Sequence, residues 1–569
     1  MFNHLIFDLD NNLYNYSLCN DKGLNKINIY IFNTYNIDLI IIQKSFNEIK
    51  KKYHNTVFHQ ASSHNKCIQF KKLCECLNLP IEESCNLYDL YIQEFNKHLE
   101  LFHGVEDFLK LCNKNNINCY ILTNNICYEQ INRLKNLNIC KYFKKIYTSE
   151  EFGIEKPDSK IFYSILQENN ININEVAMIG DSFENDIQSV NLLNIYGFWF
   201  HKNEFKLCEN YCEFNHFKQL TNFFDNYYIE TNKFIELSKY CGERYDLVQA
   251  GGGNISFKID NLLFIKSSGC LLGDMDTNKN YVCLDKNNIV NNLNNIQNEN
   301  KKVREKEAKQ LCDDSILFLK NYKPSIETTM HSLTKKYTVH LHPLQFLKIC
   351  GFENCYDLLN EKFNNFCFID YFTPGIDVAL ELNKIYDKEE LIFLKNHGIV
   401  LTSDTIENLY ILLNNTISKL EEIINMNFDN YKFTNYVSKL MNQITNKLTV
   451  SYLCCDSIIK ELYNNTINLK PYFPDKLVYC GIDIVYLNNN FKEDLIKISD
   501  YQINYHEIPK LFLYNNNIYI NSNSIKKCIE IESLLKSHLI CYDEKNNILN
   551  NEENNYLNNW DAEKYRKLV

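Results

Sequence analysis

Three short apolar segments in the first third of the chain each end at polar side chains. Residues 4–9 contain Asp8 near their end and are followed by Asp10, residues 119–123 end at Thr123, and residues 176–180 are followed by Asp181. Helical stretches separate these segments, and strands that alternate with helices predict a parallel, doubly wound sheet. Ligands of such sheets bind beyond the carboxyl ends of the strands. We therefore expect these polar residues to meet at one site.

The chain is too long for a single hydrophobic core, and its 569 residues predict two or three domains. Residues 15–100 are mostly helical in period. The pattern changes from about residue 231, after which short strands are expected at 262–266, 337–341 and 391–401. We predict four segments: a first domain at 1–205, a linker at 206–230, a second domain at 231–450 and a C-terminal extension at 451–569.

Composition and charge argue against several classes of protein. With 45% hydrophobic and 23% charged residues, the chain is typical of a soluble globular protein. Its net charge of −11 argues against nucleic acid and against an anionic membrane as partners. The 23 cysteines have no regular spacing, and the N-terminus has neither a basic region nor a long apolar region. We therefore expect free thiols and a cytoplasmic protein.

Carboxylates predict a phosphoryl-transfer site at the ends of these strands. Asp8 and Asp10 stand two residues apart after the first strand, so both are expected to point from the same side of its end. One carboxylate can attack phosphorus while the other handles the leaving-group proton. Asp181 and Asp186 add carboxylates further along the chain. Oxygen ligands that share a site with phosphate suit Mg²⁺, which we predict at these four carboxylates.

Three further residues predict a phosphate cradle. Thr123 and the following Asn124 offer a hydroxyl and backbone N–H groups, and Lys156 can neutralise the charges of the nucleophile and the phosphate. Taken in this order, the segments resemble the four motifs of the haloacid dehalogenase superfamily over about residues 1–205. The resemblance implies that Thr123 and Lys156 bind phosphate.

The same resemblance implies roles for the aspartates. Asp8 would be the nucleophile that forms an aspartyl-phosphate, Asp10 the general acid/base, and Asp181 a Mg²⁺ ligand with Asp186 nearby. The family's fold implies that residues 15–100 form a helical cap inserted after the first motif. One departure stands at Asn12, where the family usually has Thr or Val.

Three histidines predict a second metal site in the middle of the chain. His340 and His342 lie on the same side of a predicted strand because side chains alternate there, and His397 offers a third imidazole. Three neutral histidines leave positions open on a divalent ion, which is the arrangement of a catalytic Zn²⁺. Such a Lewis acid can hold a ketose carbonyl and hydroxyl. Glu327 precedes the histidine pair and could move the proton.

Glycine-rich and serine-rich segments offer a separate phosphate site in this half. Residues 250–256, Ala-Gly-Gly-Gly-Asn-Ile-Ser, would let backbone N–H groups approach an anion closely. Residues 266–269, Lys-Ser-Ser-Gly, add hydroxyls, N–H groups and a cation.

In their order, these motifs resemble the class II aldolase/adducin family over roughly residues 231–450. The resemblance implies Zn²⁺ on the three histidines and Glu327 as the acid/base. It also implies phosphate binding near five residues: Asn254, Ser256, Ser268, Gly269 and Ser325. The tail looks like that of longer members of the group, through residues 473–479 and 559–566, so we interpret 451–569 as an extension of the aldolase unit.

The predicted fold class is α/β: an N-terminal Rossmann-like doubly wound parallel sheet with a helical cap, followed by an α/β class II aldolase-like domain with a C-terminal extension. The predicted protein is a bifunctional enzyme that acts on a small phosphorylated sugar. Its Mg²⁺ phosphatase would be joined to a Zn²⁺ aldolase that makes or cleaves a ketose 1-phosphate. The zinc domain could instead be a dehydratase of the methylthioribulose-phosphate type or an epimerase.

A third hypothesis is an adducin-like binding module that accompanies one working phosphatase. Members of the aldolase family commonly build active sites at subunit contacts, so we also expect a homo-oligomer.

Overall fold

The computed structural model describes residues 2–57, 60–208, 210–277, 279–319, 321–463 and 467–559. The chain forms two compact units, Met1–Tyr228 with Leu317–Asn321 and Ile229–Ile316 with Tyr322–Val569. The end of the predicted tail motif, residues 560–566, lies outside the described residues. Among the helices of the described ranges, none is both long and apolar enough to cross a lipid bilayer.

The N-terminal unit contains a seven-stranded sheet in the order β3-β2-β1-β4-β5-β7-β6. Its strands are β1 His4–Phe7, β2 Asn118–Thr123, β3 Phe143–Thr148, β4 Val176–Gly180, β5 Tyr196–Phe200, β6 Lys206–Leu207 and β7 Tyr211–Phe214. All neighbours run parallel except β6, which is antiparallel to β7. The register sets Phe7 opposite both Ile121 and Ile179, so the three predicted strands end at one edge of the sheet.

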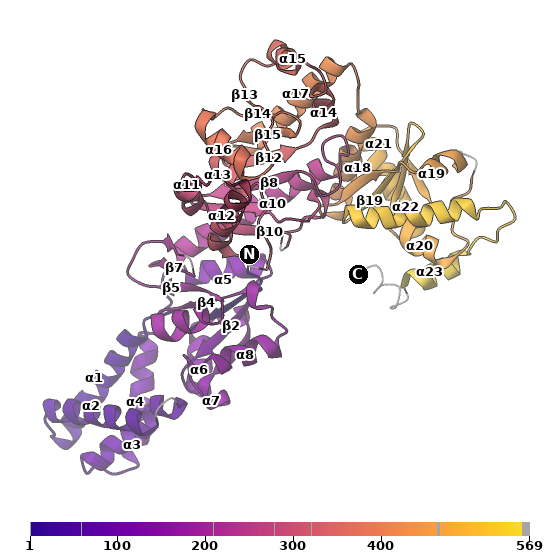
Figure 1. Ribbon diagram of the computed structural model, residues 1–569. Coiled ribbons are helices and arrows are strands. Elements are labelled where there is room, and N and C mark those ends of the chain that lie inside the picture. The colour runs from indigo at the N-terminus through magenta and orange to yellow at the C-terminus, as the bar shows by residue number, and fades with distance from the viewer. Residues whose placement is uncertain are drawn as a thin grey trace. The chain divides into compact units, whose positions relative to one another are not determined.

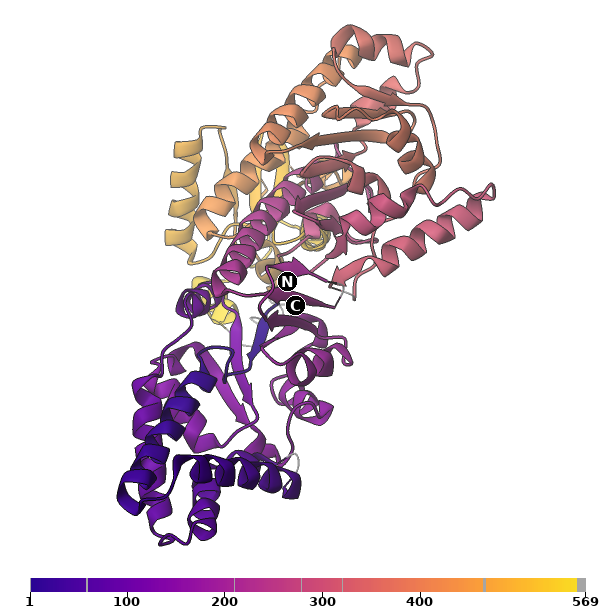
Figure 2. The same cartoon turned by 90° about the vertical axis from the view of Figure 1, so that its left-hand side faces the viewer.

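Helices surround this sheet and form a separate bundle after the first strand. The bundle, here called the cap, comprises α1 Tyr16–Tyr35, α2 Leu39–Thr56, η1 Ala61–His64, α3 Lys66–Cys76 and α4 Glu83–Lys97. The other helical elements are α5 Val105–Lys114, α6 Cys127–Asn136, η2 Cys140–Tyr142, α7 Ser149–Phe152, α8 Ser159–Glu168, η3 Ile173–Glu175, η4 Phe183–Gln188 and α9 Ser189–Asn191. Figures 1 and 2 both show the cap helices lying together, apart from the strands.

The stretch predicted as a linker, 206–230, contains two strands and the start of a long helix. Strands β6 and β7 extend the sheet, with β7 pairing in parallel with β5, and helix α10 begins at Phe217. Cys212 and Phe214 of β7 are fully buried. The strand has only four residues and includes Glu213, so its burial was not evident from composition.

The main sheet of the C-terminal unit contains, in order, β10-β9-β8-β12-β15-β14-β13. Its strands are β8 Asn254–Ile259, β9 Leu262–Lys266, β10 Tyr281–Asp285, β12 Tyr337–Leu341, β13 Cys367–Ile369, β14 Leu391–Leu394 and β15 Gly398–Ser403. These pairings are antiparallel except for β13 with β14. The strand predicted at 391–401 is two strands joined by a tight turn, in which Asn396 adopts a left-handed conformation with φ of 57°.

The predicted extension folds around a sheet of its own, in the order β16-β19-β18-β17. Its strands are β16 Val450–Leu453, β17 Ile484–Tyr486, β18 Leu511–Tyr514 and β19 Asn517–Ser522. The helices of the unit are α10 Phe217–Gly242, α11 Lys286–Leu293, α12 Lys301–Asp314, α13 Thr328–Leu333, α14 Leu344–Ile349, α15 Cys355–Lys362, α16 Ile376–Ile385, α17 Ile406–Ile424, α18 Asp429–Thr445, α19 Ser457–Leu462, α20 Pro474–Cys480, α21 Phe491–Tyr505, α22 Ile525–Ile540 and α23 Asn551–Asn559.

A buried carboxylate ties this extension to the preceding part of the unit. Glu243 follows α10 and accepts hydrogen bonds from the Ser451 backbone N–H of β16, at 2.7 Å, and from the Ser438 hydroxyl of α18. Asn435 of α18 donates a third. The extension therefore packs on the aldolase-like part through a polar contact as well as through its apolar core.

Candidate active sites

The first site lies at the carboxyl ends of β1 and β4. Asp8 directly follows β1, and its backbone N–H donates to the Ile179 carbonyl of β4 at 2.8 Å. The Lys156 ammonium, only 3% exposed, lies 2.6 Å from a carboxylate oxygen of Asp8 and 2.6 Å from one of Asp186. Burial lowers the pKa of Lys156, but the charges of Asp186 and Asp8 outweigh burial and raise it. Lys156 therefore stays cationic between the two carboxylates.

Three carboxylates at this site form a group of the kind that holds a cation. One oxygen each from Asp8, Asp181 and Asp186 lies within 4.8 Å of the others. Burial, followed by the charge of Asp186, raises the pKa of Asp181 to about 7, and burial also raises that of Asp8. A hard divalent cation would relieve this crowding of negative charge, so the donor set fits Mg²⁺.

A glycine makes room for the third carboxylate. A Cβ on Gly180, the last residue of β4, would lie 2.3 Å from a carboxylate oxygen of Asp186. The Ser182 backbone N–H donates to that same oxygen at 3.0 Å. Only a residue without a side chain lets the strand end approach Asp186 this closely.

Asp10 departs from its predicted position. Its carboxylate is not in the group formed by Asp8, Asp181 and Asp186. The Asp10 carboxylate instead accepts hydrogen bonds from four side chains: Tyr14, Asn125, Gln130 and Arg133. The expected role of Asp10 in holding Mg²⁺ stays a prediction, and in the described structure its oxygens bind these four donors.

The predicted phosphate residues lie nearby, with different partners. Thr123 ends β2, and its hydroxyl accepts from Gln130 at 3.0 Å. The Asn124 amide binds both the backbone N–H and the carbonyl of Lys156, each at 2.8 Å, so it orients the lysine. Asn12, the position where the sequence departs from the family pattern, donates from its amide to the Asp8 carbonyl at 2.8 Å and joins the ends of β1 and β4.

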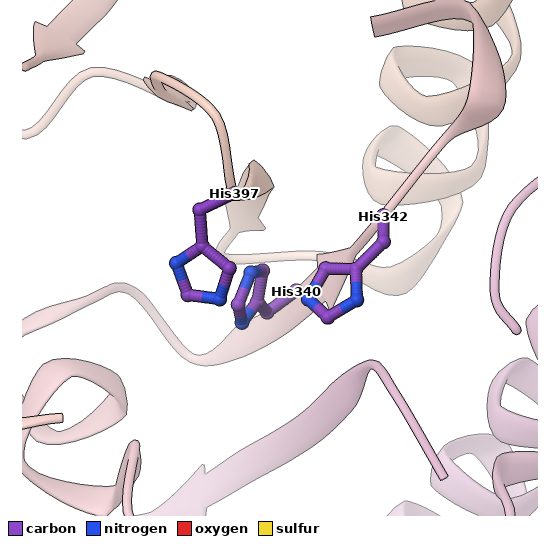
Figure 3. Close-up of side chains that lie close together, drawn as sticks. All are labelled: His340, His342 and His397. Atoms are coloured by element: carbon purple, nitrogen blue, oxygen red, sulfur yellow. The ribbon is translucent and has the colours of Figure 1, made fainter. Parts of the chain in front are cut away.

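The second site brings the three predicted histidines together. His340 lies on β12, His342 follows that strand, and His397 lies in the turn between β14 and β15. Figure 3 shows their imidazole rings facing a common space, with ring centroids 4.6 to 5.2 Å apart. One nitrogen from each ring lies within 4.8 Å of the others.

These imidazoles fit a metal ion. The Nε2 atoms of His340 and His342 are buried and have no hydrogen-bond partner among the residues that the structure describes. Burial and then the charge of His340 lower the pKa of His342 to about 3, which keeps it in the neutral form that binds metal. Gly398 permits the close approach of β15, since a Cβ there would lie 2.3 Å from the Leu341 carbonyl. The donor set suits Zn²⁺.

Glu327 stands beside the histidines, just before α13. Its carboxylate lies 2.9 Å from Nδ1 of His340 and 3.5 Å from Nε2 of His397, and it accepts from the Asn254 amide at 3.3 Å. Burial favours the neutral acid, but the charge of His340 and the hydrogen bonds hold the pKa of Glu327 well below its usual range. A carboxylate in this position can exchange a proton with a molecule bound at the histidines.

The predicted phosphate residues of this half divide into two groups. Asn254 and Ser256 are buried in β8, where the Ser256 hydroxyl pairs with His331 at 2.8 Å. The Ser256 hydroxyl is therefore already paired within the unit, and its phosphate role stays a prediction. Ser268 and Ser325 line a cavity of about 440 Å³. Gly269 follows Ser268, with no described atom within 4 Å of where a Cβ would lie.

Sequence reasoning missed residues whose roles depend on distant contacts. Arg133 and Gln130 of α6 bind Asp10, and His331 of α13 binds Ser256. Two lysines, Lys309 and Lys323, share the cavity with the serines. No motif marks these residues; the only signal is that α6 directly follows the segment Thr123–Asn125.

Comparison with known proteins assigns each half to a family. Residues 5–198 match the haloacid dehalogenase-like hydrolase family, and residues 232–420 match the class II aldolase and adducin N-terminal domain family. The chain joins a haloacid dehalogenase-like hydrolase domain to a class II aldolase-type domain. Both family predictions and the predicted fold class are thus confirmed. The two domains support the hydrolase and lyase enzyme classes.

The hydrolase domain is similar to ribulose-1,5-bisphosphate 5-phosphatase of Halopiger xanaduensis, with 26% identity over 197 residues, or 34% of this chain and 81% of that protein. The aldolase-type domain is similar to L-fuculose phosphate aldolase of Methanococcus maripaludis, with 28% identity over 198 residues, or 33% of this chain and 92% of that protein. Further relatives match over less than half of their own length.

One solved structure that the aldolase-type domain matches is the N-terminal class II aldolase domain of a conserved protein from Thermoplasma acidophilum. It is 24% identical, with a TM-score of 0.31, and the match covers 34% of this chain and 92% of that chain.

Proposed function

We propose that this chain is a bifunctional enzyme of phosphorylated sugars: a Mg²⁺-dependent phosphatase joined to a Zn²⁺-dependent aldolase that makes or cleaves a ketose 1-phosphate. The observation that carries the proposal is the pair of metal-type side-chain groups, three carboxylates with Lys156 in one unit and three histidines with Glu327 in the other. Each group lies in the domain whose family match predicts that chemistry.

In the phosphatase, Asp8 attacks the phosphorus and the bond to the leaving oxygen breaks, while Asp10 gives that oxygen a proton. Water then attacks the aspartyl-phosphate, Asp10 takes the proton, and inorganic phosphate leaves. Lys156 balances the negative charge beside the nucleophile. Mg²⁺, held by Asp8, Asp181 and Asp186, would neutralise phosphate charge when bound.

In the aldolase, a ketose 1-phosphate is cleaved to dihydroxyacetone phosphate and an aldehyde, or the reverse. Glu327 moves the proton at the carbon beside the carbonyl. The three histidines would hold Zn²⁺, which polarises the ketose oxygens when bound. Ser268 and Ser325 offer hydroxyls to the phosphate at the cavity they line. The similarity to L-fuculose phosphate aldolase favours this chemistry over dehydration or epimerisation.

The test is incubation of the protein, loaded with both metals, with a panel of ketose and aldose phosphates. Aldehyde and dihydroxyacetone phosphate from a ketose 1-phosphate support the aldolase, and free phosphate supports the phosphatase. Loss of water without cleavage supports a dehydratase, and isomerisation alone supports an epimerase. Phosphate release without any change in the carbon skeleton favours the adducin-like alternative and contradicts the proposed bifunctional enzyme.

We also propose that the protein works in the cytoplasm as a homo-oligomer, with residues 451–569 as an extension of the aldolase unit. All 23 cysteines are free thiols, which suits a reducing compartment. The oligomer rests on the family resemblance, and sedimentation showing only monomer at micromolar concentration contradicts it.

A further inference from the structure

A single arginine in the hydrolase domain links the proposed acid/base to the cap. Arg133 lies on α6, is 3% exposed, and places Nη1 2.9 and 3.0 Å from the two carboxylate oxygens of Asp10. Its Nη2 donates to Glu129, one helical turn earlier, at 2.8 Å. The guanidinium is thus fixed at both ends, because its planar fork is held between two carboxylates.

This contact determines which way the Asp10 side chain points. The other donors to Asp10, from Tyr14, Asn125 and Gln130, are neutral. Arg133 is the only charged partner that the structure describes for this carboxylate. Charge-assisted hydrogen bonds are roughly twice as strong as neutral ones. Arg133 therefore contributes the largest single restraint on the orientation of the residue that must reach the leaving oxygen.

The opposite side of the same guanidinium contacts the cap. Two aromatic rings lie over it, that of Tyr16 from α1 at 5.2 Å and that of Phe95 from α4 at 4.9 Å. Both distances are in the range of a cation–π interaction, which strengthens when water is excluded. Since Arg133 belongs to α6 and the rings belong to the cap, the stacking exists only while the cap lies on the sheet domain.

We propose that Arg133 is a positioning residue that couples closure of the cap to the orientation of Asp10. With the cap in place, Tyr16 and Phe95 hold the guanidinium, and the guanidinium holds the Asp10 carboxylate in the orientation that the structure describes. With the cap open, Arg133 loses both rings, so only the carboxylates of Asp10 and Glu129 still hold its guanidinium and the Asp10 carboxylate is less firmly oriented. The inference rests on the proposed phosphatase function, because it assigns Asp10 the transfer of the leaving-group proton.

A comparison of leaving groups tests this role. A 4-nitrophenolate leaves readily without a proton, whereas an alkoxide needs the general acid, which contributes roughly 10²- to 10⁴-fold in enzymes. We expect Arg133→Met to lower kcat for an alkyl phosphate by about 10²-fold and kcat for 4-nitrophenyl phosphate by less than about tenfold. Arg133→Lys, which keeps the charge but not the fork, should fall between wild type and Arg133→Met. A merely structural role would lower both activities equally.

Three further variants separate orientation from folding. In an Asp10→Asn background, Arg133→Met should cause little additional loss, because the two residues act as one unit. Tyr16→Leu should reproduce part of the alkyl-selective loss, whereas Lys145→Met, which removes an exposed ion pair with Glu168, should leave both rates unchanged. A thermal melt of each variant shows whether it is folded.

The outcomes are distinct. Equal loss on both esters in Arg133→Lys, or additive losses in the double variant, overturns the positioning role. If wild-type protein with Mg²⁺ releases phosphate from neither ester, the phosphatase function itself is wrong and the inference falls with it. Alkyl-selective loss in both Arg133 variants, with non-additivity against Asp10, supports the proposal.

Discussion

Replacing Glu243 by glutamine should make the C-terminal unit more stable at alkaline pH. Burial raises the pKa of the Glu243 carboxyl to about 7, although Ser438, Ser451 and Asn435 donate hydrogen bonds that oppose the rise. The ordinary value is 4.5. Below pH 4.5 the Glu243 carboxyl is protonated in both the folded and the unfolded state. As the pH rises towards about 7, the unfolded state releases this proton first, so the free energy of unfolding falls.

The size of the effect follows from the shift. About 2.5 pKa units correspond to roughly 3 kcal/mol lost between pH 4.5 and pH 8, as an upper bound. Unfolding entropies near 2.1 cal/mol/K per residue give a unit of roughly 340 residues about 0.7 kcal/mol/K. The difference in melting temperature between Glu243→Gln and wild type should therefore change by about 4 °C in favour of the variant between pH 5 and pH 8.

Scanning calorimetry of the full chain at pH 5 and pH 8 measures the melting temperatures. Subtracting the wild-type melting temperature from that of the variant at each pH cancels the effect of other titrating groups. Ser438→Ala is a matched control because it removes one donor to the carboxylate and should depress stability more at pH 8 than at pH 5. If the variant and wild-type melting temperatures differ by the same amount at both pH values, Glu243 is already ionised in the fold without penalty and the reasoning fails.

Three further predictions concern the two sites. Asp8→Asn should abolish Mg²⁺-dependent phosphate release and leave the zinc reaction nearly intact; release of phosphate at the wild-type rate would contradict the nucleophile assignment. His340→Ala should lose bound zinc, whereas Glu327→Gln should keep it and lose turnover, as metal analysis with an aldolase assay would show; zinc retained in the first variant or lost in the second would mean that the ligand set is wrong. Gly180→Ala should raise the Mg²⁺ concentration needed for half-maximal phosphatase activity at least tenfold, because its Cβ would displace Asp186, while aldolase activity serves as the internal control.

Local patterns predicted the parts of each site that stand at strand ends. The apolar runs before Asp8, Thr123 and Asp181 were evident because buried parallel strands are continuously hydrophobic, and their register then brings the polar residues to one edge. The alternation along β12 likewise put His340 and His342 on one side. The metal roles of these residues stay predictions.

Contacts between distant segments decided the rest. Strand β7 was missed because it is short and contains Glu213, so only its pairing with β5 in the sheet shows that it is buried. The partners of Asp10 include Arg133, which lies 123 residues away in the sequence. Ser256 was assigned to a phosphate loop, yet it lies within β8, facing His331.

The amino-acid sequence by itself therefore determined which chemical groups the protein carries and at which strand ends they stand, because strand period and strand termination are local properties of the chain. The tertiary structure alone decided which of those groups face one another. Orientation of a side chain such as Asp10 depends on the strongest partner within reach, and that partner comes from a helix whose position follows only from the packing of the whole domain.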